Sequence, residues 1–323
     1  MREKAAVRGV PPLGWKSTAD LTKEEWRHLR PIVREHVSPC RSGCPIGTRV
    51  EIFLDHVKKG KTKEAFFEIA ERNPLPSTTG RVCYRFCEKE CTREKFDRSL
   101  AIGSLERFVG DSALSERYPL DLPRKGREGK IAVVGSGPAG LSFAYQMRKR
   151  GFRVILYDRK GRPGGMLTHI IPEYRLPAGV PAAEITRLLE GGIEFVRREV
   201  SPREIPSLAR EADALCVATG AWEETPPEGI RPDGRTVVTA SSFLEAVRVN
   251  PPPLKGKPVA VIGGGNSAVD SARAALRLGG EVTVCYRRRE ADMPAYREEY
   301  EEAVKEGVEF LFCASPLRLE RDG

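Results

Sequence analysis

The sequence predicts an α/β protein in which a helical, cysteine-rich domain precedes two Rossmann-like domains. Three observations support this fold class. Glycine-rich turns at 135–140 and 263–268 each follow an apolar strand-like run and precede a helical run. Residues 1–118 read as mostly helical. Five of the eight cysteines lie in that helical part. The two turns therefore predict two parallel sheets, and the crowded cysteines predict a metal centre beside them.

Composition narrows the class of protein. The chain has 323 residues, which leaves room for two or three domains, and 40% of them are hydrophobic and 31% charged. No run approaches the roughly 18 apolar residues of a membrane span, and the N-terminus lacks a secretory signal, so we expect a cytoplasmic protein without a membrane span. The net charge is +9, but acids and bases are interleaved and only 7% of residues are aromatic. We therefore expect no nucleic-acid partner; an acidic protein partner, or none, explains the charge equally well.

The helical part has recognisable starts and ends. Thr22 and Glu25 form a capping-box pattern that predicts one helix start. Amphipathic runs predict further helices at 48–58, 62–72 and about 100–116. The proline-, glycine- and charge-rich segment 119–129 predicts a linker.

Beyond the linker, strands alternate with helices. Strands are predicted at 131–135, 152–158, 193–196 and 213–220, and in a second cycle at 258–265, 281–289 and 308–315. We accordingly expect one domain over 130–254 and a second over 255–323.

The first glycine turn has the arrangement of a dinucleotide site. The expected contacts are Gly135, Ser136, Gly137, Pro138, Ala139 and Gly140. One glycine allows the tight turn, one lets the backbone approach a pyrophosphate, and one lets helix and strand pack closely. Asp158 ends the next strand, where it can accept hydrogen bonds from a ribose. An ordinary flexible turn is the alternative.

The second turn differs at the position that selects the nucleotide. Its expected contacts are Gly263, Gly265, Asn266, Ser267 and Ala268. Where an NAD site carries an acid, this chain has Tyr286 followed by three arginines, Arg287, Arg288 and Arg289. Guanidinium groups bind a 2′-phosphate, so the pattern predicts NADPH, although a solvated basic strand end would look the same.

Two dinucleotide sites in series suggest hydride transfer from a nicotinamide to a flavin. Such cofactors carry the reactive chemistry themselves, so no catalytic side chain is required. The histidines are scattered through the chain and none is assigned a catalytic role: His28, His36, His56 and His169.

The cysteine spacing favours iron–sulfur ligation over zinc. The five N-terminal cysteines are separated by three residues within each group: Cys40, Cys44, Cys83, Cys87 and Cys91. Zinc sites usually show two-residue spacings, whereas a cysteine–proline ending such as Cys44-Pro45 is familiar in iron–sulfur proteins. On one continuous helix, Cys83 and Cys91 would lie about 12 Å apart, too far for one cluster. Either the segment is not wholly helical, or Cys91 serves another purpose; five reduced cysteines without metal are a further alternative.

The three remaining cysteines lie singly within apolar strand-like runs. We expect them to be buried core residues: Cys216, Cys285 and Cys313.

Taken together, these segments resemble the family of glutamate synthase small subunits. That family includes the bifurcating NADPH:ferredoxin oxidoreductase subunits and the iron–sulfur/flavin half of dihydropyrimidine dehydrogenase. The matching stretches are PCRSGCPIGT, NPLPSTTGRVCYRFCEKEC, LAIGSLERFVGD, VVGSGPAGLSFA, GRPGGMLTHIIPEYRLP, CVATGAW, VIGGGNSAVDSARAALRLG and YRRREADMPAYREE. The resemblance implies a helical domain with [4Fe-4S] clusters, an FAD domain and an NADPH domain.

The resemblance also implies ligands for the clusters. One cluster would use Cys44, Cys83, Cys87 and the carboxylate of Glu106, for which an exposed helical acid is the alternative. A second cluster would use Cys40 and Cys91 with two upstream cysteines, but Ile32 and Glu35 occupy those positions. We therefore expect one cluster, with Cys40 and Cys91 either uninvolved or replacing a weaker ligand.

For the nucleotides, the resemblance implies two sets of contacts. The ADP half of FAD would contact Gly135, Gly137, Ala139, Gly140 and Asp158, and the flavin side would contact Gly165, Met166, Thr219 and Gly220. NADPH would contact Gly263, Gly265, Asn266, Ser267, Ala268, Arg287 and Arg288.

One departure concerns the C-terminal end. Family members return after the NADPH domain to complete the FAD domain, whereas this chain ends at LRLERDG, so the FAD domain is expected to be incomplete. A shortened sequence, completion by another subunit, or loss of flavin would each explain this.

The predicted function is that of an oxidoreductase subunit. Electrons would pass from NADPH through FAD to a [4Fe-4S] cluster and on to another redox subunit or ferredoxin, in a hetero-oligomer. The alternative is an iron–sulfur wiring or scaffold subunit whose nucleotide sites are idle or completed by another chain. A third alternative is a binding module that is stabilised by zinc.

Overall fold

The computed structural model describes residues 37–318, apart from 124–127 and 228, together with Glu320. The expected helix start at Thr22 and the positions Ile32 and Glu35 lie outside the described residues. From Ser38 onward the contacts join the chain into one unit.

The N-terminal part is helical, as predicted. Its elements are α2 (Pro39–Gly43), α3 (Val50–Lys58), α4 (Thr62–Ala70), α5 (Pro76–Val82), α6 (Phe86–Lys89), η2 (Thr92–Lys95) and α7 (Ile102–Ser115). The three amphipathic runs recognised in the sequence are α3, α4 and α7. Their apolar faces meet in one core, in which Phe53, Phe66 and Val109 are fully buried.

Helices α5 and α7 pack closely because both carry glycine at the contact. A Cβ atom added at Gly80 would lie 2.5 Å from the backbone nitrogen of Arg107. One added at Gly110 would lie 2.3 Å from the backbone nitrogen of Ser77. Real Cβ atoms do not approach backbone this closely, so the crossing requires glycine at both positions.

The cysteine-bearing segment 83–91 is not one helix. Cys83 has extended backbone angles and ends α5, Arg85 has a left-handed φ of 54°, and α6 is only four residues long. This settles the alternative left open by the spacing, because the sulfur atoms are not held on one helical face.

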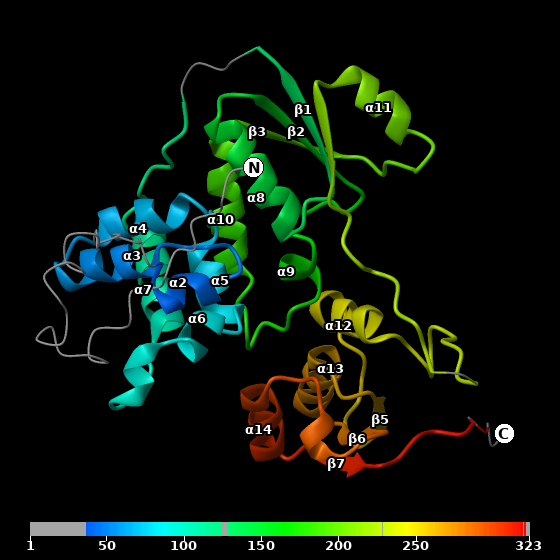
Figure 1. Ribbon diagram of the computed structural model, residues 1–323. Helices are drawn as coiled ribbons and strands as arrows, with labels where there is room; N and C mark the ends of the chain where they lie inside the picture. The colour runs from blue at the N-terminus through cyan, green and yellow to red at the C-terminus, as the bar shows by residue number, and fades with distance from the viewer. Residues whose placement is uncertain (1–36, 124–127, 228, 319, 321–323) are drawn as a thin grey trace, which may run out of the picture. The chain divides into compact units, whose positions relative to one another are not determined.

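The first sheet is parallel, with strand order β3-β2-β1-β4. Its strands are β1 (Lys130–Val134), β2 (Arg153–Asp158), β3 (Ile193–Arg197) and β4 (Ala214–Val217). The helices of this region are α8 (Pro138–Lys149), α9 (Met166–His169), α10 (Gly179–Glu190) and α11 (Ile205–Glu211) (Figure 1).

Alternate residues of β1 face different helices. Val133 packs with α8 and α10, whereas Ala132 packs with Leu208 of α11. Helices therefore cover both faces of the sheet, as parallel sheets require. In the register, Val134 pairs with both Tyr157 and Val217, so the carboxyl ends of three strands meet beside the first glycine turn.

The second sheet is also parallel, in the order β5-β6-β7. It contains β5 (Pro258–Ile262), β6 (Glu281–Tyr286) and β7 (Glu309–Phe312), with α12 (Ala240–Val249), α13 (Asn266–Arg277), η3 (Glu290–Asp292) and α14 (Arg297–Glu306). The face toward α13 and α14 is apolar, and Val284 of β6 is buried there in one cluster with Ala303 of α14.

One prediction about the isolated cysteines is wrong. Cys216 and Cys285 are half-buried in strands, but Cys313 is exposed and has a φ of 55°, just after β7 ends. The chain turns there to let the backbone nitrogen of Cys313 donate to the carbonyl oxygen of Arg288. The apolar run therefore ends one residue before Cys313.

No helix among the described residues combines the length and apolar character needed to cross a bilayer.

Candidate functional site

The first glycine turn joins β1 to α8, and each of its glycines meets a different demand. Gly135 has a φ of 103°, and an added Cβ atom would lie 2.2 Å from the carbonyl oxygen of Ala218. At Gly140 the added atom would lie 1.9 Å from the carbonyl oxygen of Gly135. At Gly137 it would meet nothing within 4 Å. Sterics thus require the first and third glycines, while the middle one faces open space in front of the helix N-terminus, where a pyrophosphate binds in this arrangement.

The second turn, between β5 and α13, repeats this geometry. Gly263 has a φ of 132°, and Gly265, like Gly137, would place a Cβ atom in open space. Ala268 takes the third position, where its methyl group lies 3.6 Å from a Cβ atom added at Gly263, an ordinary contact. The added atom at Gly264 would meet the Tyr286 ring at 2.5 Å, so that ring covers the turn from one side.

The side chain of Asp158, at the end of β2, is hydrogen-bonded to the first turn. The Oδ2 atom of Asp158 accepts hydrogen bonds from the backbone nitrogen of Ser136 at 2.7 Å and from the Ser136 hydroxyl group at 2.6 Å. Its Oδ1 accepts a bond from the backbone nitrogen of Lys160 at 2.8 Å. A carboxylate has about four acceptor positions, so Asp158 can still accept from a ribose hydroxyl.

A pocket of about 600 Å³ opens at the carboxyl ends of the first sheet. This volume suits a ligand of cofactor-fragment size. Four predicted site residues line the pocket: Gly135, Asp158, Thr219 and Gly220.

The sequence reading missed several residues that shape this pocket. Trp222 lines it, and the cationic groups of Arg159 and Lys160 lie 5.8 and 5.4 Å from the Trp222 ring. Cations over an indole face attract its π electrons. Arg159 and Lys160 directly follow Asp158, so the sequence could have indicated that they lie beside this pocket. It could not have indicated that they contact Trp222.

The turn expected on the flavin side lies against the first glycine turn. The backbone nitrogen of Gly164 donates to the carbonyl oxygen of Ser136 at 2.9 Å, and a Cβ atom at Gly165 would lie 2.7 Å from the Cα of Gly137. Met166 instead packs in a small apolar cluster with Ile170, which follows α9, and with Leu244 of α12 and Ala274 of α13.

The side chains expected to contact NADPH have different surroundings. Asn266 Oδ1 accepts a hydrogen bond from the backbone nitrogen of Tyr296 at 2.9 Å, so this amide has a structural partner. Ser267 is exposed. Arg287 and Arg288 are exposed and form no ion pair with any other described residue, whereas the neighbouring Arg289 pairs with Asp292 at 3.2 Å.

Four of the six predicted metal ligands lie near one another. The pKa of Cys87 is raised to about 12, chiefly by burial, and the charges of Cys83, Cys44 and Glu106 act in the same direction. Burial also raises the pKa of Cys83, where Glu106 and Cys44 act in the same direction. Mutual effects of this kind require the groups to be close. These are the four ligands that the family resemblance implied for one cluster.

Glu106 is held in place by its neighbours. Its Oε1 accepts hydrogen bonds from Asn73 Nδ2 at 2.9 Å and from the Thr79 hydroxyl at 2.5 Å. Burial raises the pKa of Glu106 to about 7. The side chain is half-buried and so is not the freely exposed helical acid considered as the alternative.

The other two predicted ligands, Cys40 and Cys91, are half-buried. Neither contributes to the largest charge effects on Cys83 or Cys87. The thiol of Cys40 instead donates to the Ser38 hydroxyl at 3.3 Å. Within the described part of the chain, no three His, Cys, Asp or Glu side chains are arranged around a point that suits a single metal ion. A four-iron cluster is larger and holds its ligands farther apart than one ion does.

Two known protein families match different parts of this chain. Residues 129–323 match the family described as pyridine nucleotide-disulphide oxidoreductase. Residues 33–118 match the family described as dihydropyrimidine dehydrogenase domain II, 4Fe-4S cluster.

Curated relatives match most of this chain but are longer. The beta subunit of the NADP(+)-dependent formate dehydrogenase of Moorella thermoacetica is 36% identical, over 87% of this chain and 44% of the relative. The glutamate synthase [NADPH] small chain of Escherichia coli K12 is 33% identical, over 88% of this chain and 64% of the relative. The beta subunit of an NADPH-Fe(3+) oxidoreductase of Geobacter sulfurreducens is 32% identical, over 89% and 44%. The chain thus spans less than two thirds of the length of these relatives.

Among solved structures, a 2-naphthoyl-CoA reductase complex matches with a TM-score of 0.51 and 21% identity, over 69% of this chain and 32% of that one. This likeness concerns the fold. Together the matches confirm the predicted fold class, the family resemblance, the redox-enzyme class, and the nucleotide-binding and 4Fe-4S regions.

Proposed function

Because the chain belongs to the pyridine nucleotide-disulphide oxidoreductase family, we propose that it is an oxidoreductase subunit carrying electrons from NADPH through FAD to a [4Fe-4S] cluster. One observation carries this proposal. Two helix N-termini in the same chain, behind Gly137 and Gly265, each leave the space that a pyrophosphate needs. A set of three thiols and a carboxylate lies in the same chain.

The proposed FAD site is built around the first turn. Backbone nitrogens from Gly135 to Gly140 would hold the pyrophosphate, and Asp158 would hold the ribose. The flavin side would meet Gly165 with Met166, and Thr219 with Gly220. Support comes from the pocket, which Asp158, Thr219 and Gly220 line.

The proposed NADPH site is built around the second turn. Gly263, Gly265 and the start of α13 at Asn266, Ser267 and Ala268 would hold the pyrophosphate. Arg287 and Arg288 would grip the 2′-phosphate, and their exposure without an ion pair to the other described residues leaves their donors available.

The proposed cluster ligands are Cys44, Cys83, Cys87 and Glu106. Cys40 and Cys91 are left without this role. Because thiols must lose protons to bind metal, the raised pKa values of Cys83 and Cys87 mean that ligation here releases protons.

The chemistry that bound FAD would supply is acceptance of a hydride from a nicotinamide and release of single electrons toward an iron–sulfur cluster. The residues of this chain bind and orient these groups, and no side chain is assigned a catalytic role.

The proposal also includes a protein partner and a cellular compartment. The names of two relatives describe beta subunits, and a third is a small chain, which supports a role within a hetero-oligomer that passes electrons to another redox subunit or ferredoxin. We place the protein in the cytoplasm. We also propose domain boundaries at 118, 129 and 254, which separate the helical region and the two sheets.

The test is composition and reduction of the full chain purified without oxygen. We expect about four irons and four sulfides with FAD, and loss of flavin absorbance when NADPH is added. The variant Gly265→Val should keep iron and flavin but lose reduction by NADPH, whereas Gly179→Ala, at an open position outside both turns, should behave like the parent chain. Iron without flavin reduction would favour the scaffold alternative, and zinc in place of iron would contradict both.

A further inference from the structure

Tyr84 directly follows the proposed cluster ligand Cys83, and its ring is stacked on that of Tyr296. The ring centroids are 3.5 Å apart and the planes differ by 5°. Phe86 meets the Tyr296 ring edge-on at 6.3 Å, and the ammonium group of Lys89 lies 4.9 Å from the centre of the same ring. The segment that carries Cys83 and Cys87 therefore contacts a side chain from the connection between β6 and α14.

Tyr296 is in turn anchored to the second glycine turn. Its backbone nitrogen donates to Asn266 Oδ1 at 2.9 Å, and the backbone nitrogen of Ala295 donates to the carbonyl oxygen of Gly264 at 3.0 Å. Two adjacent hydrogen bonds thus join 295–296 to the loop that would bind the pyrophosphate.

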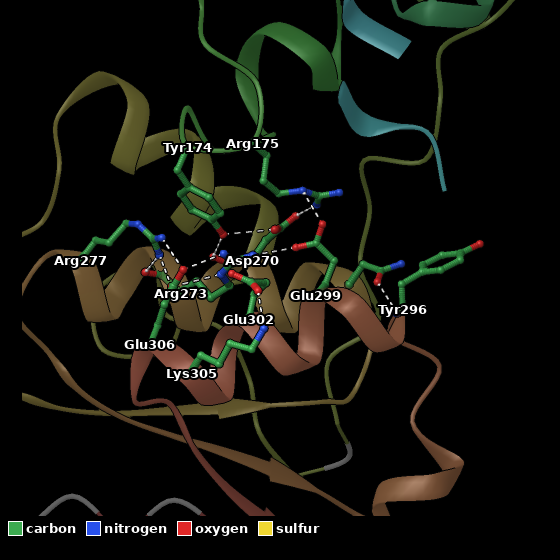
Figure 2. A network of polar contacts seen from close by, with 11 residues as sticks. Tyr174, Arg175, Asp270, Arg273, Arg277, Tyr296, Glu299, Glu302, Lys305 and Glu306 are labelled. Carbon is green, nitrogen blue, oxygen red and sulfur yellow. Dashed lines mark hydrogen bonds and ion pairs between the residues drawn. The ribbon is translucent and has the colours of Figure 1, made fainter. Parts of the chain in front are cut away.

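A second set of contacts reaches Tyr84 from α13. The guanidinium group of Arg175 donates a hydrogen bond to the hydroxyl group of Tyr84. The guanidinium of Arg175 forms ion pairs with Asp270 of α13 at 2.6 Å and with Glu299 of α14 at 3.2 Å. Figure 2 shows Arg175 and Tyr174 pointing toward Asp270, and Tyr296 at the end where α14 begins.

This polar network is buried and well connected. The side chains of Arg175 and Asp270 are 10% and 9% exposed. Arg273 links Glu299 to Glu306, each at 2.7 Å, so α13 and α14 are joined to each other as well as to Arg175. A buried ion pair contributes little net stability but restricts geometry, because separating its members leaves a charge without a partner.

The backbone beside Cys83 has little freedom to absorb a displacement. Arg85 holds a left-handed φ of 54°, and Glu88 Oε1 accepts a 2.8 Å hydrogen bond from the backbone nitrogen of Gly103 at the start of α7. A shift of Tyr84 is therefore transmitted to Cys83 rather than dissipated in the loop.

From these contacts we infer that Tyr84 is a positioning residue through which dinucleotide binding at the second glycine turn and cluster binding at Cys83 stabilise each other. Cluster ligation fixes Cys83 and Tyr84, which pre-orders Tyr296 and the turn that it supports. By linkage, nucleotide binding must order the cysteine segment to the same extent. This inference rests on the proposed function for both sites, and it adds a coupling between them.

The test compares hydrogen exchange in the iron-loaded full chain with and without NADP+, which binds without donating a hydride. Protection of 263–268 reports binding, and protection of 83–91 reports coupling. We expect NADP+ to slow exchange in both segments, by about fivefold or more in 83–91, the lower end of usual coupling between sites. Tyr84→Leu should keep protection of 263–268 and lose that of 83–91. Tyr84→Phe, which keeps the stack, should retain part of the effect.

Tyr300→Leu is the matched control, since Tyr300 pairs with Phe310 at 4.8 Å within the second sheet region. In Tyr300→Leu, NADP+ should still slow exchange in both 263–268 and 83–91. If Tyr84→Leu loses iron, Tyr296→Leu breaks the same stack from a position remote from the cysteines in sequence.

Two results would overturn the coupling: protection of 263–268 without protection of 83–91 in the parent chain, or protection of 83–91 that persists in the leucine variants. Absence of protection at 263–268 in iron-loaded chain would instead overturn the proposed nucleotide site, and the coupling with it.

Discussion

Glu184 Oε1 on α10 accepts a 2.7 Å hydrogen bond from the backbone nitrogen of Ser77 on α5, although the residues are 107 positions apart in the sequence. The other carboxylate oxygen accepts a 2.9 Å bond from the backbone nitrogen of Thr78. Glu184 is fully buried, and it satisfies N–H groups in the first turn of α5 that have no partner within their own helix.

Replacing Glu184 should therefore destabilise the chain. Glu184→Ala leaves two buried N–H groups without acceptors, so we expect a loss of about 2 to 4 kcal/mol in the free energy of unfolding. Urea denaturation measures this loss. Glu194→Ala on the exposed surface of β3 is the control and should change stability by less than about 0.5 kcal/mol.

The same residue should make stability depend on pH. Burial raises the pKa of Glu184 to about 7 from its usual 4.5. Since the folded-state pKa is raised, the stabilising effect of the protonated form is complete below pH 4.5 and is lost as pH rises through 7. Glu184→Gln stays neutral, so the stability of the parent chain relative to this variant should fall by about 3 kcal/mol over that range. A constant difference from pH 4.5 to 7.5 would contradict the expectation.

The crossing of α5 and α7 should not tolerate a methyl group. Gly80→Ala and Gly110→Ala would each place a Cβ atom within about 2.5 Å of backbone, which only a shift of one helix can relieve. We expect each to lower stability by about 3 kcal/mol. Gly179→Ala, in open space at the start of α10, should be neutral or slightly stabilising. Thermal melting of the three variants tests the contrast.

Gly137→Ala should separate flavin binding from folding. The added methyl group meets no protein atom within 4 Å, so stability should be unchanged, but it enters the space proposed for the FAD pyrophosphate. The purified variant should contain iron and little flavin. Full flavin content would show that the cofactor does not approach this position.

Arg287 and Arg288 should determine the preference for NADPH over NADH. Loss of one charge-assisted contact to a 2′-phosphate costs about tenfold in binding. Arg287→Ala and Arg288→Ala should each raise the KM for NADPH about tenfold and leave that for NADH unchanged. The control is Arg289→Ala, because Arg289 is paired with Asp292. Equal effects on both nucleotides would argue against phosphate recognition.

The local features of this protein could be predicted from its amino-acid sequence. The strand–turn–helix pattern around Gly135 and Gly263, the acid at the end of β2, and the amphipathic runs of α3, α4 and α7 all depend on neighbours a few residues away. Backbone sterics and periodicity act over that range, so these elements could be predicted.

The contacts between side chains that are distant in the sequence could not be predicted and became known from the three-dimensional fold. Glu184 with Ser77, Asn73 with Glu106, and Tyr84 with Tyr296 are separated by between about 30 and 210 positions. The fold also brought the ammonium group of Lys160 over the ring of Trp222. Such pairs depend on how whole helices and sheets pack, and the spacing of residues along one element carries no information about that packing.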